Sequence, residues 1–334
     1  MNKKTVAFSK DSSNLFFHLL TKCNLSCKHC YINKKEHGEN TLDIETIKRW
    51  LNLFSEKCNT INVIFLGGEP TLHPDLSLAV KEAGRLGFKS ITIDTNGYLF
   101  HDILHRVTPD EVDFISFSLD GATPATNDVI RGKGCHEQVV KGVKKAVAEG
   151  FSTSMIYTVS GDNIHELHRM PELVKGWGLE RFFIQVIGIR GESADTNNDL
   201  QVSMEQWLNV VPGVAEAMAR QGIIVTYPRV FLDETEPFQC AGIVADNYFI
   251  FPNGRIYRCP LCEDFPLHSF TIDGNAIVPT GKINETDLFD LTIPEGCVMN
   301  KMIQPGNITY KSDGTPLKRI ACCMLKEEMS PINV

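Results

Sequence analysis

The chain has 334 residues, 43% of them hydrophobic and 22% charged, which is enough to bury a substantial core in one large domain or in a domain with an appendage. The formal net charge is -8, and acidic and basic residues are mixed along the chain, so the sequence does not indicate nucleic-acid binding. It contains no run of about 18 apolar residues and no apolar segment at the N-terminus, which argues against membrane spanning and secretion. We therefore expect a cytoplasmic protein with neither a nucleic-acid nor a membrane partner.

Short apolar runs alternate with amphipathic stretches over residues 15–226. The apolar runs that we expect to be strands cover 15–21, 61–68, 90–97, 114–121, 153–160 and 181–189. The helical patterns cover 43–57, 74–87, 99–106, 136–149, 163–176 and 203–221. Near-continuous apolar strands separated by helices indicate βαβ units and a parallel sheet buried on both faces. Six such units predict an α/β fold, a partial (β/α)6 TIM-like barrel that follows an N-terminal segment of residues 1–14.

The pattern changes after about Tyr227, where helical periodicity gives way to Pro, Gly, Asn and Asp. The short runs "NYFIF" and "RIYRC", joined by "PNG", predict a β-hairpin. Five of the six C-terminal cysteines lie on or after this hairpin, and Cys240 lies just before it. We therefore expect residues 227–334 to form a small cysteine-rich domain.

The chain has eleven cysteines. In a reducing compartment, closely spaced thiols are metal ligands or catalysts rather than disulfides. Cys23, Cys27 and Cys30 form the motif C-x3-C-x2-C directly after the first predicted strand, where a barrel builds its sites. Three thiolates can hold three irons of a cubane cluster and leave the fourth iron open to a small molecule.

The stretch "CNLSCKHC" resembles the signature loop of radical S-adenosylmethionine (SAM) enzymes. The resemblance implies a 4Fe-4S cluster on Cys23, Cys27 and Cys30, whose fourth iron is chelated by the amino and carboxylate groups of SAM. In that family the reduced cluster cleaves SAM to methionine and a 5'-deoxyadenosyl radical, which abstracts hydrogen from a substrate. His29 occupies the position that the family fills with an aromatic residue beside the adenine. The electron is then expected from an external donor such as flavodoxin or ferredoxin.

The second predicted strand ends in "FLGGEP", residues 65–70. Two glycines let the backbone approach a ligand closely, and the carboxylate beside them can accept from an ammonium group. The stretch resembles the family's GGEP motif, which implies that Gly67, Gly68 and Glu69 receive the amino group of SAM.

Polar residues also end the next two predicted strands. Thr95 and Asn96 close one strand, and Ser118 and Asp120 close the other, where small polar groups can address ribose hydroxyls and a carboxylate. Arg131 resembles the arginine that pairs with the SAM carboxylate in relatives with a similar SLDG stretch, a task that suits a bidentate guanidinium.

Three further polar residues lie within the predicted strands. Gln185 and Tyr157 are candidates to face the barrel interior and contact SAM or substrate, and the alternative for each is a hydrogen-bonded core side chain. Tyr157 is in addition a candidate catalytic residue. We expect His18, on the first strand, to be a hydrogen-bonded core histidine.

The C-terminal cysteines have their own spacing. Cys240 is followed after thirteen residues by Gly254, then after four by Cys259, with Cys262 completing a C-x2-C pair. This resembles the opening pattern of the SPASM and twitch auxiliary-cluster domains. The further C-x2-C-x5-C-x3-C block of a full SPASM domain is absent from the sequence, so one auxiliary 4Fe-4S cluster is expected. A structural zinc site with four thiolates is the alternative.

The resemblance implies that a downstream cysteine closes the auxiliary cluster. Cys322 and Cys323 are both placed to do so, and Cys322 is the predicted ligand. Cys297 and the other member of the tandem pair then have no assigned ligand role. If the reaction is an epimerisation, Cys297 is a candidate catalytic thiol that returns a hydrogen atom.

The leading hypothesis is a radical SAM enzyme with one auxiliary cluster. It would oxidise, epimerise or couple a small metabolite or a peptide presented by a separate partner. The alternative is a cytosolic metal-cluster protein, with zinc or iron-sulfur, that acts as a scaffold or redox sensor without SAM chemistry.

Overall fold

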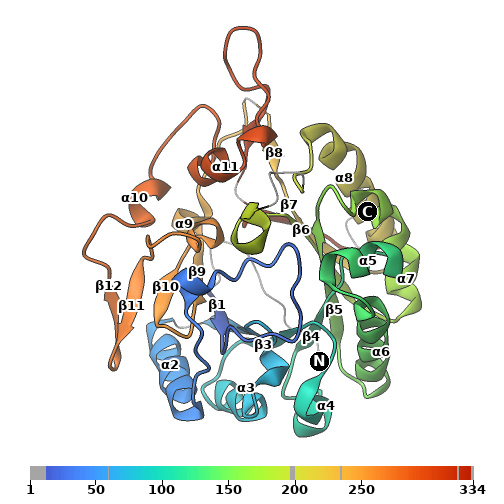
Figure 1. The fold of residues 1–334 in the computed structure, drawn as a ribbon, viewed down its shortest axis with the longest axis vertical. Coiled ribbons are helices and arrows are strands. Elements are labelled where there is room, and N and C mark those ends of the chain that lie inside the picture. The colour runs from blue at the N-terminus through green and yellow to red at the C-terminus, as the bar shows by residue number, and fades with distance from the viewer. Residues whose placement is uncertain (1–12, 59, 196–199, 234, 322, 332–334) are drawn as a thin grey trace.

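The computed structural model describes residues 13–58, 60–195, 200–233, 235–321 and 323–331. Six parallel strands joined by helices form its centre, which confirms the predicted α/β partial barrel (Figure 1). The strands are β1 (Ser13–His18), β2 (Ile61–Leu66), β3 (Ser90–Thr95), β4 (Phe114–Ser118), β5 (Thr153–Val159) and β6 (Arg181–Val186). Each strand pairs in parallel with the next one along the chain.

Helices cover the outside of this curved sheet (Figure 1). They are α2 (Ile44–Lys57), α3 (Leu76–Arg85), α4 (Ile103–Arg106), α5 (Pro124–Arg131), α6 (Cys135–Ala148), α7 (Met170–Gly176) and α8 (Met204–Arg220), with the short α1 (Lys34–His37) after the first loop. Asp43 caps the start of α2 by accepting from the Thr46 N–H, and Ser203 forms a capping box with Gln206 at the start of α8. Over the described ranges, no helix is long and apolar enough to cross a bilayer.

The sequence did not predict two features of these helices. Helix α5 was not expected, because its eight residues give only two turns of periodicity. The stretch predicted as a helix at 163–176 begins as a 3-10 helix, η3 (Ile164–Arg169), before α7.

The C-terminal segment adds strands to both ends of the same sheet. Its elements are β7 (Ile224–Pro228), β8 (Phe231–Leu232), α9 (Ala241–Val244), β9 (Asp246–Ile250), β10 (Arg255–Tyr257), β11 (Phe270–Asp273), β12 (Ala276–Pro279), α10 (Thr286–Phe289), α11 (Val298–Ile303), β13 (Arg319–Ile320) and β14 (Lys326–Met329). The predicted hairpin is confirmed as β9 and β10, and β9 pairs in parallel with β1. At the other end β7 pairs with β6, and β14 pairs with β7. The boundary predicted at 226/227 therefore falls within β7.

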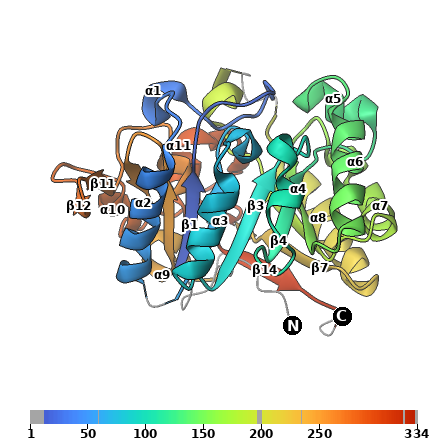
Figure 2. The ribbon, with the colours of Figure 1, turned by 90° about the horizontal axis from the view of Figure 1, so that it is seen from below.

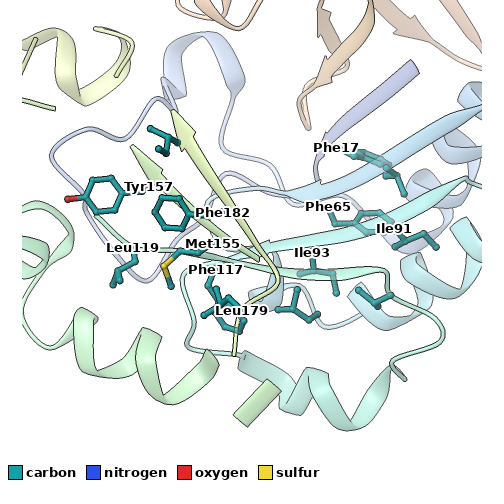
Figure 3. Close-up of a cluster of buried hydrophobic side chains, with 14 of the residues drawn as sticks. Phe17, Phe65, Ile91, Ile93, Phe117, Leu119, Met155, Tyr157, Leu179 and Phe182 are labelled. Carbon is teal, nitrogen blue, oxygen red and sulfur yellow. The ribbon is translucent and has the colours of Figure 1, made fainter. Parts of the chain in front are cut away.

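Alternate residues of each strand divide between two environments. Phe17, Phe65, Ile93, Phe117 and Met155 are fully or almost fully buried against the helices, where they form the main hydrophobic cluster (Figure 3). The residues between them face the barrel interior, and the last ones along each strand lie at its carboxyl end. The phase of this alternation decides which strand residues can reach a ligand.

A row of buried amides crosses the inside of the sheet. Asn62 Nδ2 donates to Asn14 Oδ1 at 2.8 Å, and Asn14 Nδ2 donates to Asn247 Oδ1 at 2.8 Å. Ser90 Oγ donates to Asn62 Oδ1 at 2.9 Å. The row joins β9, β1, β2 and β3, so it fixes the register of the C-terminal strand β9 on the barrel.

Candidate functional site

A cavity of about 280 Å³ opens at the carboxyl ends of the six parallel strands. The loop from β1 to α1, which carries Cys23, Cys27 and Cys30, lies across this end of the barrel (Figures 1 and 2). The cavity is lined by many of the predicted site residues: Cys23, Cys27, His29, Cys30, Gly67, Gly68, Glu69, Asn96, Ser118, Arg131 and Gln185. The structure thus brings together groups that lie on or after five of the six strands.

Backbone hydrogen bonds hold the cysteine loop against the barrel. The Lys28 N–H donates to the Ile130 carbonyl on α5 at 2.9 Å, and the Glu192 N–H donates to the Cys30 carbonyl at 2.8 Å. Burial raises the pKa of the Cys23 thiol to about 11 and that of the Cys27 thiol to about 12. Without a metal these thiols are protonated near neutral pH, so metal binding at the loop releases protons.

The two glycines after β2 pack against this loop. A β-carbon on Gly67 would lie 2.6 Å from the Leu20 carbonyl oxygen, and one on Gly68 would lie 2.3 Å from the Lys22 carbonyl oxygen. The sequence suggested that the glycines admit a ligand, whereas the atoms they admit are the backbone of the loop. Glycine is required here because no other residue lets the two segments approach so closely.

Glu69 ties the ends of β2 and β3 together. Its buried carboxylate accepts from the Thr71 N–H at 3.1 Å, from Thr95 Oγ1 at 2.8 Å and from the Asn96 N–H at 2.7 Å. Burial raises its pKa, and the three donors oppose that shift. Asn96 continues the network, since its Nδ2 donates to Asn24 Oδ1 in the cysteine loop at 2.8 Å.

Asp120 joins two of the predicted SAM contacts. Its Oδ2 lies 2.8 Å from His29 Nε2 and 2.5 Å from Arg131 Nε, and its Oδ1 accepts from the Thr158 N–H at 2.7 Å. Burial opposes ionisation of Asp120, but Arg131 and His29 outweigh burial and lower its pKa to about 2. The carboxylate is therefore ionised, and Nε2 of His29 carries the proton that it shares with Asp120.

The other nitrogen of His29 is a buried polar atom facing this site. Within the described residues, His29 Nδ1 has no hydrogen-bond partner, and only 10% of the side chain is exposed. Buried polar atoms normally have a partner. An unsatisfied ring nitrogen and three thiols on one cavity wall fit a bound cofactor with iron and polar groups.

Tyr157 does not line the cavity, so the structure does not bring it together with the other predicted site residues. On β5 the residues Ile156 and Thr158 line the cavity, and Tyr157 points the other way, beside Phe182 and Leu119 (Figure 3). Its hydroxyl donates to the Asn163 carbonyl at 2.9 Å. Tyr157 therefore matches the alternative given in the sequence analysis, a hydrogen-bonded core side chain.

His18 is buried and fully hydrogen-bonded. Its Nδ1 lies 3.0 Å from the Ile250 carbonyl oxygen, and its Nε2 lies 2.6 Å from the Tyr31 hydroxyl. A carbonyl can only accept, so Nδ1 carries the proton and Nε2 accepts from Tyr31. Burial lowers the pKa of His18 to about 3, which keeps the ring neutral.

The cavity also contains charged residues that the sequence analysis did not single out. Arg190 forms an ion pair with Glu263 and lies 4.7 Å above the Tyr31 ring. Asp94 and Lys326 line the same cavity, and burial raises the pKa of Asp94 to about 7. An acid inside the apolar strand "SITIDT" and an arginine directly after the predicted strand 181–189 were the signals available for Asp94 and Arg190.

The C-terminal cysteines lie around a second, smaller cavity of about 20 Å³. Cys240, Cys259, Cys297 and Cys323 line it. Cys262 is buried in the same apolar cluster, and Cys322 lies outside the described residues. Over the described part of the chain, no three His, Cys, Asp or Glu side chains surround a single metal-ion position.

Cys297, predicted as a catalytic thiol, lines the smaller cavity and not the larger one. Its backbone N–H donates to the Ile320 carbonyl at 3.0 Å, and this bond holds it beside β13 at the smaller cavity. Of the described C-terminal cysteines, Cys323 is the one that also lines the larger cavity. Cys297 is therefore not placed to return a hydrogen atom to a substrate there.

Three thiols lie at the carboxyl end of a parallel α/β barrel. This arrangement is typical of the class of proteins that bind a metal cofactor on a partial TIM barrel. The Radical SAM superfamily matches residues 18–174. The matched residues include the cysteine loop and the turn at 67–69, and the match to this superfamily implies a 4Fe-4S cluster and SAM binding.

Two curated relatives differ in how much of their length the chain covers. The probable GTP 3',8-cyclase of Saccharolobus solfataricus is 27% identical over 269 residues, which are 77% of this chain and 85% of that protein. The Fe-coproporphyrin III synthase of Methanosarcina barkeri is 29% identical over 201 residues, 58% of this chain. The chain spans about half, 49%, of the length of the Methanosarcina barkeri protein.

Solved structures share the fold at low sequence identity. Streptococcus suis SuiB bound to the precursor peptide SuiA has a TM-score of 0.63 at 13% identity, with 88% of this chain and 65% of that chain covered. anSMEcpe with bound AdoMet and a peptide has a TM-score of 0.58 at 13% identity, with 74% of each chain covered.

Proposed function

We propose that this protein is a radical SAM enzyme that abstracts hydrogen from a small metabolite or a peptide, leading to oxidation, epimerisation or bond formation. The observation that carries the proposal is one cavity of about 280 Å³ walled by the cysteine loop, the Gly67–Gly68 turn and Arg131, which is paired with Asp120. Three thiols supply iron ligands, and a buried arginine supplies a partner for a carboxylate.

The residues of this chain divide the work of holding the cofactor. Cys23, Cys27 and Cys30 would bind three irons, and the turn at 67–69 would receive the amino group of SAM. Arg131 would pair with the SAM carboxylate. The remaining contacts to SAM or substrate would come from His29, Asn96, Ser118 and Gln185. When bound, the cluster and SAM supply one-electron cleavage of SAM and hydrogen-atom abstraction from the substrate.

Asp120 prepares two of these contacts before any ligand arrives. Because it is ionised and bonded to Arg131 Nε, it fixes the direction of the guanidinium. Because it also holds His29 Nε2, the other ring nitrogen is left for the ligand. Such preorganisation lowers the entropy lost when SAM binds.

The walls of the cavity limit the entry of water. Phe16 and Phe249 stack at a centroid distance of 4.4 Å, and both line the cavity together with Ile187 and Leu261. Apolar walls protect a reactive intermediate from solvent.

The auxiliary cluster and the partners are further parts of the proposal. Cys240, Cys259, Cys262 and a downstream cysteine, predicted as Cys322, would hold a second 4Fe-4S cluster. An external electron donor such as flavodoxin or ferredoxin would reduce the first cluster in the cytoplasm. A peptide substrate is supported by the shared fold of SuiB, whose structure contains its precursor peptide.

Anaerobic reconstitution tests the proposal. Two clusters correspond to about eight irons per chain, and reduction in the presence of SAM should release 5'-deoxyadenosine. Cys27→Ala should abolish this release and leave the C-terminal cluster loaded, and Cys58→Ala, at the end of α2, should match the wild type. Bound zinc without SAM cleavage would instead support the metal-cluster scaffold or redox sensor.

A further inference from the structure

A second group of thiols gathers around the smaller cavity, which Cys23, Cys27 and Cys30 do not line. Cys240, Cys259, Cys297 and Cys323 line the cavity of about 20 Å³, and Cys262 is fully buried in the same cluster of side chains. These five positions come from four separate stretches of sequence. Their convergence is therefore a property of the fold and not of local spacing.

Three elements deliver the thiols. Cys240 is the residue before α9, Cys297 is the residue before α11, and Cys259 lies directly after the β9–β10 hairpin. The short 3-10 helix η5 (Pro260–Cys262) then turns Cys262 back toward Cys259, and the Cys262 N–H donates to the Cys259 carbonyl at 3.1 Å.

The position of Cys297 is determined on both sides. Its N–H donates to the Ile320 carbonyl, and the Ile320 N–H donates to the Glu295 carbonyl at 2.8 Å. Gly296 lies between them, and a β-carbon there would lie 2.5 Å from the Ile320 oxygen. This close backbone pairing fixes Cys297 at the wall of the smaller cavity, which Cys240 and Cys259 also line.

A buried carboxylate supports the Cys259 side of the group. Glu285 accepts from the Arg258 N–H at 2.6 Å and from the Cys259 N–H at 2.9 Å. Apart from Arg258, the remaining walls are mostly apolar, with Phe238, Leu261, Phe289 and Met299 among them. Thiolate sulfurs that ligate iron tolerate such a dry environment because the metal neutralises their charge.

We propose that Cys240, Cys259, Cys262 and Cys297 are the four ligands of the auxiliary cluster, with Cys297 in the place that the sequence assigned to Cys322. The inference rests on the auxiliary cluster of the proposed function and specifies its ligands. Cys323 is then a non-ligand thiol on the wall between the two cavities.

That wall is one side chain thick. Pro260, Leu261, Cys323 and Met324 line both the smaller and the larger cavity. The proposed ligands therefore lie directly behind residues that a substrate in the larger cavity would touch.

The test uses the full-length chain with Cys23, Cys27 and Cys30 all changed to Ala, so that iron reports on the second site alone. Anaerobic reconstitution of this background should give about four irons per chain and a 4Fe-4S signal in the electron paramagnetic resonance (EPR) spectrum after reduction. Adding Cys297→Ala should lower the iron to about three or fewer and remove or convert that signal. Adding Cys322→Ala, Cys323→Ala or the distant control Cys58→Ala should leave about four irons and the same spectrum.

A second variant separates ligation from folding. Cys297→Ser keeps the size of the side chain and should also alter the EPR spectrum, while circular dichroism and the thermal unfolding midpoint of the metal-free protein stay near those of the background. Full iron content and an unchanged spectrum in both Cys297 variants would overturn the ligand set alone. No iron in the background protein would overturn the auxiliary cluster as well, and SAM cleavage by the wild type would still test the first cluster separately.

Discussion

Gly68 and Lys22 meet backbone to backbone, with the position of a Gly68 β-carbon only 2.3 Å from the Lys22 carbonyl oxygen. The Glu69 N–H donates to the same oxygen at 3.1 Å. Through this contact the end of β2 holds the start of the cysteine loop. The turn at 67–69, which we propose receives the amino group of SAM, therefore also fixes the position of the loop.

Gly68→Ala should therefore displace the cysteine loop. The added methyl group collides with backbone atoms that no rotamer change can move, so we expect a loss of at least half of the iron bound by the first cluster and a lower thermal unfolding midpoint. Gly213→Ala, in helix α8, is the matched control because its β-carbon has no atom within 4 Å. Equal iron content in the two variants would contradict this role of Gly68.

Asp120→Asn should weaken both SAM binding and the fold. The change leaves the buried Arg131 guanidinium without its charge partner, which costs roughly 3–5 kcal/mol in comparable buried pairs. We expect a raised dissociation constant for SAM in equilibrium dialysis and a lower free energy of unfolding in urea. Glu216→Gln removes the exposed ion pair with Arg220 and should leave both quantities near the wild-type values.

Stability should fall as the pH decreases below about 6.5, because His18 and His37 are buried as neutral rings. Burial lowers the pKa of each to about 3, whereas an unfolded histidine binds its proton near pH 6.5. Between these two pH values the unfolded state binds more protons than the folded state. Each histidine therefore lowers the free energy of unfolding by up to roughly 1.4 kcal/mol for each unit by which the pH decreases. Urea titrations at several pH values give the free energy of unfolding as a function of pH. The slope of this free energy against pH should be shallower for His18→Gln and unchanged for the exposed control His105→Gln.

Asn14→Ala should destabilise the junction between β1 and β9. The substitution removes the donor to Asn247 Oδ1 and leaves Asn62 Nδ2 with only its longer bond to the Ser13 carbonyl, at 3.4 Å. A buried polar group that loses its partner costs roughly 1–3 kcal/mol. We expect the free energy of unfolding to decrease by that order, with faster amide hydrogen exchange in β9. The exposed Asn40→Ala is the control, and equal stability of both variants would rule out this function of the amide row.

Tyr157→Phe should leave SAM cleavage at the wild-type rate. The lost hydroxyl bonds only the Asn163 carbonyl within the core, so about 1 kcal/mol of stability is the expected cost. The rate of SAM cleavage in this variant is compared with the rate in Gln185→Ala, which changes a residue at the cavity wall. A large loss of cleavage in Tyr157→Phe, with SAM binding intact, would restore a catalytic function for this tyrosine.

The sequence predicted those parts of the site that depend on local order. Cys23, Cys27 and Cys30 follow a strand within eight residues, and apolar strands alternate with helices, so both patterns are visible without tertiary contacts. The side to which Tyr157 points depends on the phase of β5. Met155 and Val159, two residues away on either side, share its apolar face, and this was the signal that it belongs to the core.

Other contacts were beyond the reach of the sequence. The pairing of Gly68 with Lys22, and of Cys297 with Ile320, joins segments that no local pattern relates. Two donors to Glu69, Thr95 Oγ1 and the Asn96 N–H, lie at the end of β3 and could be assigned only once the strand order was known. The ligand set that we propose for the smaller cavity rests on such distant contacts, whereas Cys322 was predicted from a resemblance in the sequence.

The pairing of β9 with β1 and of β14 with β7 has a consequence for biosynthesis. As the chain leaves the ribosome, β1 and its cysteine loop emerge long before the strand that covers the free edge of β1. An uncovered strand edge invites pairing with another chain. The nascent barrel therefore depends on its last hundred residues for protection, and iron delivered to the loop before they arrive would meet an unfinished sheet.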